Sequence, residues 1–132
     1  MNHKEAMMAE KEIRVVLIGK NEDINEILGI MLVRRGFHAE YMSIEVKALK
    51  VIKDNNPDII ILDIERWGVD EMMICEGIRT DESIKDIPII FCIPGHVREI
   101  VPYASDSDQY LQKPFKFDNL YRKICLILKI SG

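Results

Sequence analysis

The chain has 132 residues, with 48% hydrophobic and 30% charged side chains and a formal net charge of −4. This length and composition are typical of one globular domain with a single core. No apolar run approaches the ~20 residues that cross a bilayer, and a net negative charge disfavours a nucleic-acid interface, which needs a basic stripe. We therefore expect a cytoplasmic protein that binds neither membrane nor nucleic acid.

The first half of the chain alternates between short apolar runs and helical patterns. Residues 1–12 form a polar leader without the apolar core of a signal peptide, so the domain is expected over 13–132. The apolar run 15–18, closed by Gly19, predicts a strand buried on both faces. Asn21 to Asp23 begin a helix over about 24–32, and Gly36 ends it. A strand over 37–42 and a helix over 46–52, stopped at 55–57, follow.

The second half continues the alternation. The strongest apolar run, 59–62, predicts a third strand that ends at Asp63. A helix over 72–78, strands over 88–93 and 110–112, and a last helix over 117–128 come next. Pro102 restricts the fourth helix to a short segment, roughly 97–101. Such alternation predicts a parallel sheet with helices on both sides, whose functional groups gather at the carboxyl ends of the strands.

The cysteines and histidines do not form a recognisable site. The cysteines are far apart, lie among apolar neighbours and lack the spacing of metal ligands, so we expect buried free thiols. The histidines are isolated too, so neither a zinc site nor a Cys–His nucleophile pair is supported. The residues concerned are Cys75, Cys92, Cys125, His3, His38 and His96.

Asp63, at the carboxyl end of the third strand, has two interpretations. It could cap a turn, or it could be a carboxylate nucleophile that accepts a phosphoryl group. The neighbouring motifs favour the second. Residues 57–64, PDIIILDI, closely resemble the phosphoacceptor strand of response regulator receiver domains, and residues 68–70, GVD, resemble the loop that follows it. Residues 110–115, YLQKPF, are similar to the family's switch aromatic and Lys-Pro signature, and the resemblance extends over about 13–130.

The resemblance implies a fold, a function and partners. The fold is a flavodoxin-like (βα)5 three-layer α/β sandwich with a parallel five-stranded sheet of order 2-1-3-4-5. The function is that of a non-enzymatic receiver module in two-component, phosphorelay signal transduction. Asp63 then has the phosphoacceptor position, Lys113 contacts the phosphoryl group and Tyr110 is the switch aromatic. The implied partners are a histidine kinase, a phosphotransferase or a downstream effector, and a homodimer could form through the face of the fourth helix, fifth strand and fifth helix.

Several positions depart from the family's pattern. The acidic pair that binds Mg²⁺ in the family corresponds to Gly19 and Lys20, and its Thr or Ser corresponds to Ile93. A glycine has no ligating side chain, a lysine brings positive charge to the place of the cation, and an isoleucine donates no hydrogen bond. We therefore predict an impaired Mg²⁺ site with no metal or other cofactor. Our hypothesis is that Lys20 and Lys113 both pair with Asp63.

Further departures lie in the loop after Asp63, where Trp67 and Glu71 take the positions of a family proline and glycine. Trp67 could cover the site or meet a partner, and Glu65 could overhang the site or be solvated. Glu22 and Asp23 could form a displaced acidic pair, although helix capping and dipole compensation explain them adequately.

Two other classes of function compete with a phosphorylated receiver. One is a phosphorylation-independent pseudo-receiver that acts as an interaction or dimerisation module. The other is a flavin-binding domain of the same fold class. The flavin-binding class is disfavoured because no Gly/Ser/Thr-rich phosphate loop follows the first strand.

Overall fold

The computed structural model describes residues 12–95, 97–105 and 108–131. Almost all of the predicted leader therefore lies outside the described residues, as do His3 and His96. Helices and strands alternate along the chain as predicted. Their bounds are β1 Arg14–Ile18, α2 Glu22–Arg34, β2 His38–Met42, α3 Ala48–Asn55, β3 Ile59–Asp63, α4 Val69–Thr80, β4 Ile89–Ile93, the 3₁₀ helix η1 Arg98–Tyr103, β5 Gln109–Gln112 and α5 Phe117–Leu128.

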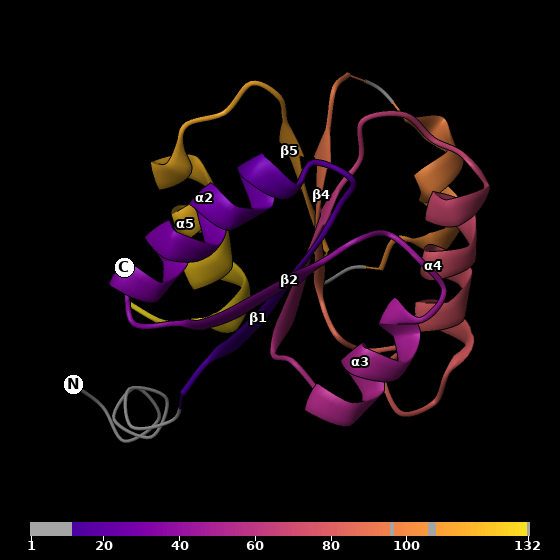
Figure 1. Cartoon of the computed structure of the whole chain (residues 1–132), viewed down its shortest axis with the longest axis horizontal. Helices are drawn as coiled ribbons and strands as arrows, with labels where there is room; N and C mark the ends of the chain where they lie inside the picture. Colours follow the sequence, from indigo (N-terminus) through magenta and orange to yellow (C-terminus); the bar gives the residue numbers. More distant parts are fainter. Residues whose placement is uncertain (1–11, 96, 106–107, 132) are drawn as a thin grey trace.

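The five strands form one parallel sheet of order β2-β1-β3-β4-β5, which confirms the predicted flavodoxin-like topology. Figure 1 shows α2 and α5 on one face of this sheet, and α3 and α4 on the other. The chain passes from β1 outward to β2 and then returns to β3 on the other side of β1. The carboxyl ends of β1 and β3 therefore meet at the point where the strand order reverses, which is the usual binding site in such sheets.

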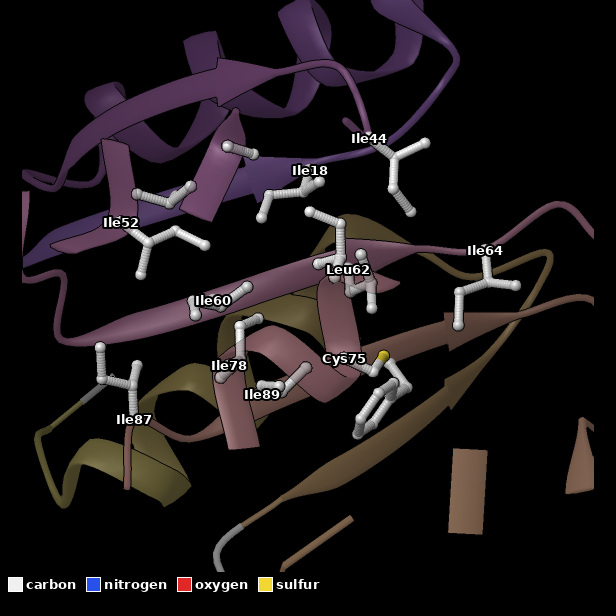
Figure 2. Close-up of a cluster of buried hydrophobic side chains, with 14 of the residues drawn as sticks. Ile18, Ile44, Ile52, Ile60, Leu62, Ile64, Cys75, Ile78, Ile87 and Ile89 are labelled. Carbon is white, nitrogen blue, oxygen red and sulfur yellow. The ribbon is translucent and has the colours of Figure 1, made fainter. Parts of the chain in front are cut away.

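The central strands are apolar on both faces because helices cover both faces. Every residue of β3 and β4 is buried. Successive side chains alternate between the two faces, so Ile60 and Leu62 point toward α3 and α4, while Ile59 and Ile61 point toward α2 and α5. Figure 2 shows the cluster of buried side chains on the α3 and α4 face, with Ile60 and Leu62 lying between Ile18 of β1 and Ile78 of α4.

Local signals set the ends of α2 where the sequence placed them. The side chain of Asn21 accepts a hydrogen bond from the peptide N–H of Ile24 at 3.1 Å. At the other end, Gly36 has a φ of 92°, and the N–H of Phe37 bonds back to the carbonyl of Leu32 at 3.1 Å. This αL glycine closes the helix as predicted.

The buried face of α2 is not the face that its apolar residues suggest. Ile24 and Ile27 are exposed, whereas Asn25 and Gly29 are buried. Gly29 lies close to Leu17 of β1, since a Cβ atom added to it would be 3.8 Å from that side chain. A small residue lets the helix approach the sheet, and this approach decides which side of the helix faces inward.

The predicted short fourth helix is present as η1, which contains Pro102. The partly buried Arg79 and the buried Asp108 anchor the segment around it. The guanidinium of Arg79 donates from Nε to the carbonyl of Tyr103 at 2.6 Å and also pairs with Asp108. The Asp108 carboxylate in turn accepts the N–H groups of Ile89 and Ser105, each at 2.7 Å.

Candidate functional site

Asp63 lies at the switch point of the sheet, as the last residue of β3. Its carboxylate is only 6% exposed. Gly19 follows β1 directly beside it, and a Cβ atom added to Gly19 would lie 2.9 Å from the Cβ of Asp63. The missing side chain at position 19 thus lets the β3 carboxylate pack against the backbone of the neighbouring strand.

Lys113 is the charged partner of Asp63, as the sequence predicted. Its ammonium group pairs with Oδ1 of Asp63 and donates to the carbonyl of Ile64 at 3.0 Å. The backbone of Lys113 is held as well, because its N–H bonds to the carbonyl of Ile93 at 2.7 Å, just past the end of β5. A cis peptide bond joins Lys113 to Pro114.

The second carboxylate oxygen, Oδ2 of Asp63, is buried and has no hydrogen-bond partner among the described residues. Cys92 lies next to this carboxylate, because it pairs with Asp63 in the register of β3 and β4. Burial, together with this neighbouring carboxylate, raises the pKa of the Cys92 thiol to about 12. Asp63 is therefore a buried acid with one oxygen paired to Lys113 and one oxygen without a hydrogen-bond partner in the described structure.

Lys20 does not pair with Asp63, and this part of our hypothesis is wrong. Within the described chain its ammonium group forms ion pairs with Glu71 at 3.4 Å and with Asp70 at 3.7 Å. The expected Lys–Asp–Lys cluster is replaced by two separate pairs, Lys113 with Asp63 and Lys20 with the start of α4. The reason is that Glu71 is buried, and a buried carboxylate requires a charged partner.

Asn25 is a second polar residue beside the site that sequence reasoning missed. It is 1% exposed. Its side-chain amide donates to the carbonyl of Gly19 at 3.4 Å, and its own carbonyl oxygen has no partner in the described structure. The signal that could have identified it is a polar residue placed four positions after the N-cap Asn21, between exposed Ile24 and Ile27.

The remaining predicted positions lie around this site or on the adjoining face. Ile93 is buried at the end of β4. The ring of Trp67 is half-buried and stacks on Tyr103 of η1, with centroids 6.0 Å apart. Glu65 is exposed.

Tyr110 stacks on Phe91 of β4 with a centroid distance of 5.5 Å, and 43% of its surface is exposed. Partial burial, with a smaller contribution from the Asp108 carboxylate, raises the pKa of its phenol. Tyr110 lines a groove of about 550 Å³ between β5 and η1, together with Val97 and Val101. The face expected to bind partners is therefore hollowed rather than filled by a full helix.

The three cysteines are buried free thiols, as predicted. Glu22 and Asp23 lie in the first turn of α2 and are exposed. No three His, Cys, Asp or Glu side chains within the described ranges are grouped so that they could share a metal ion. None of the described helices has the length and apolar composition needed to cross a bilayer.

The fold and the site define a class of protein: a doubly wound α/β domain with a lysine-paired aspartate at the switch point of a parallel sheet. The chain matches the response regulator receiver domain over residues 15–125 and belongs to that family of signalling domains. One of its relatives is the DNA-binding dual master transcriptional regulator RpaA of Synechocystis, which is 26% identical over 88% of this chain. Another is the transcriptional regulatory protein CseB of Streptomyces avermitilis, which is 28% identical over 95% of this chain.

The chain spans about half the length of these relatives, 49% of RpaA and 52% of CseB. Solved structures support the fold. The receiver domain of the sensor histidine kinase PA1611 from Pseudomonas aeruginosa, solved with a magnesium ion in its active site cleft, gives a TM-score of 0.74 at 21% identity, covering 90% of this chain and 99% of that one. A response regulator receiver protein from Sinorhizobium medicae gives 0.74 at 19% identity, covering 90% and 96%.

Proposed function

We propose that this chain is a non-enzymatic receiver module in which Asp63 has the phosphoacceptor position and the Mg²⁺ site is impaired. The observation that supports this proposal is the pairing of Lys113 with one oxygen of a buried Asp63 whose other oxygen has no partner. In phosphoryl transfer, such an oxygen attacks the phosphorus atom of an acyl phosphate, the bond from phosphorus to the leaving oxygen breaks, and the free carboxylate departs. Lys113 is placed to neutralise part of the charge that gathers there.

The residues beside Asp63 do not fit a magnesium ion. Mg²⁺ requires near-octahedral oxygen ligands and is held in proteins mainly by carboxylates. Gly19 contributes no side chain, and Lys20 contributes an ammonium group that is already paired with the start of α4. The chemistry proposed for Asp63 therefore involves no bound metal.

The test is incubation with acetyl phosphate, with and without Mg²⁺, followed by intact-mass measurement of the phosphorylated fraction. We expect Mg²⁺ to produce no increase in that fraction. The Asp63→Asn variant is the control for modification at other residues. Stoichiometric modification of Asp63 that depends on Mg²⁺ would contradict the proposal.

A second candidate is a pseudo-receiver that binds partners without phosphorylation. The ion pair of Lys113 with Asp63 favours it, because a cation already occupies one side of the acceptor carboxylate. Under this alternative Asp63 takes up no phosphoryl group in any condition, yet partner binding persists. The same mass measurement therefore separates the two candidates.

The partners that we propose are proteins: a histidine kinase, a phosphotransferase, a downstream effector or a second copy of the chain. The face made of η1, β5 and α5 exposes Val101, Tyr110 and Leu126. Apolar side chains on a shared face can support a homodimer. Sedimentation velocity should then show a dimer that Leu126→Glu weakens, and a wild-type monomer at high concentration would exclude this part of the proposal.

A further inference from the structure

Glu71 is a buried carboxylate that phosphate chemistry at Asp63 does not require. Its side chain is 2% exposed, Oε2 faces the ammonium group of Lys20 at 3.4 Å, and Oε1 has no hydrogen-bond partner among the described residues. Burying a carboxylate costs free energy unless an opposite charge accompanies it. Lys20 is the charged group that meets this requirement, and Asp70, which also contacts Lys20, is about half exposed.

The start of α4 is shaped to hold this carboxylate. Glu71 is the third residue of the helix, after the N-cap Gly68. A Cβ atom added to Gly68 would lie 3.1 Å from Oε1 of Glu71, so glycine leaves the carboxylate room to fold back over the first turn. The positive end of the helix dipole favours a negative charge at this place.

Lys20 is the residue immediately after Gly19, whose backbone lies against Asp63. The side chain of Lys20 therefore starts beside the acceptor carboxylate and extends to Glu71. Relative to the family pattern, position 20 has exchanged an acid for a base, and position 71 has gained an acid in place of a glycine. These two departures contact one another, so the positive charge introduced at position 20 is matched by the negative charge introduced at position 71.

We propose that Lys20 and Glu71 form an internal ion pair that takes the place of a divalent cation beside Asp63. Glu71 acts as a positioning residue: it holds the ammonium group of Lys20 at the rim of the site and away from direct contact with Asp63. The inference rests on the proposed function, because it explains how the site does without Mg²⁺. It predicts that replacing the pair by a carboxylate at position 20 creates affinity for Mg²⁺, since an oxygen ligand then stands where the ammonium group was.

The test is a Mg²⁺ titration of the whole chain, followed by calorimetry and by the fluorescence of Trp67. This residue is the only tryptophan of the chain, and it lies in the loop that follows Asp63. The wild type should show no saturable response at millimolar Mg²⁺. The double variant Lys20→Asp/Glu71→Ala should bind Mg²⁺ about tenfold more tightly or better, because it restores a carboxylate beside Asp63. Lys20→Met, which leaves Glu71 unpaired, should show a smaller gain.

A matched control is Lys47→Asp/Glu45→Ala, which makes the same exchange at an exposed ion pair of 3.0 Å. Its Mg²⁺ response should equal that of the wild type. A folded double variant that remains insensitive to Mg²⁺ overturns this inference and leaves the proposed function standing. Tight Mg²⁺ binding by the wild type overturns both.

The pairing itself is tested without any metal. Lys20→Met, Glu71→Gln and their combination form a double-mutant cycle on the urea midpoint of unfolding. We expect the combined variant to lose less than the sum of the two single losses. Additive losses would overturn the inference even if the charge-reversal variant fails to fold.

Discussion

Asp108 offers a test of the network that anchors η1 to the rest of the domain. Its side chain is fully buried, and its carboxylate accepts two peptide N–H groups and pairs with Arg79. Asp108→Ala removes all three interactions at once. Loss of one partner of a buried ion pair costs roughly 3–5 kcal/mol, and the orphaned N–H of buried Ile89 costs about 1–3 kcal/mol. These contributions overlap, so we expect a loss of about 4 kcal/mol in the free energy of unfolding.

This loss is a large part of the roughly 5–15 kcal/mol that stabilises a typical domain. The assay is urea unfolding, followed by Trp67 fluorescence and by circular dichroism. Asp108→Asn retains one acceptor oxygen and should lose less. The control is Asp54→Ala, which breaks an exposed ion pair with Lys50 and should leave the midpoint unchanged. A loss below about 1 kcal/mol for a cooperatively unfolding Asp108→Ala variant would refute the reasoning, since one orphaned N–H alone should cost that much.

Three further predictions follow from other parts of the structure. Burial raises the pKa of the Cys92 thiol to about 12. This thiol should therefore not react with a disulfide reagent at pH 8 until urea unfolds the chain. The pKa of Asp81 is lowered from 3.8 to about 2 by hydrogen bonds from Lys53 and Ser83. The stabilising contribution of this carboxylate is therefore full above about pH 4 and is lost as the pH falls through 2. A carboxyl NMR titration should show this low titration midpoint, and Ser83→Ala should raise it. Gly36→Ala, at a φ of 92°, should lower the free energy of unfolding by about 1 kcal/mol in a urea titration.

Each of these predictions has a result that contradicts it. Reaction of Cys92 in the native state would mean that the sheet opens at this strand. An Asp81 midpoint near 4 would mean that the contacts with Lys53 and Ser83 are not maintained in solution. An unchanged unfolding midpoint for Gly36→Ala would mean that the αL conformation is not required to end α2.

The order of helices and strands could be predicted from the sequence because the signals for it are local. The run 59–62 has no polar residue, so it had to be a strand covered on both faces. The side chain of Asn21 caps the start of α2, and Gly36, which has no side chain, adopts the positive φ that ends it. The pairing of Asp63 with Lys113 was expected from the resemblance of residues 57–64 and 110–115 to receiver domains, and the structure contains this ion pair.

The tertiary structure alone decided which partner each remaining charge and helix face would take. Lys20 follows Gly19, which lies against Asp63, yet its ammonium group pairs with the buried carboxylate of Glu71. Likewise, the buried side of α2 depends on how closely Gly29 lets the helix approach the sheet, not on where its isoleucines lie. Periodicity and capping act between near neighbours in sequence, whereas the free energy of a buried charge depends on groups that only folding brings together.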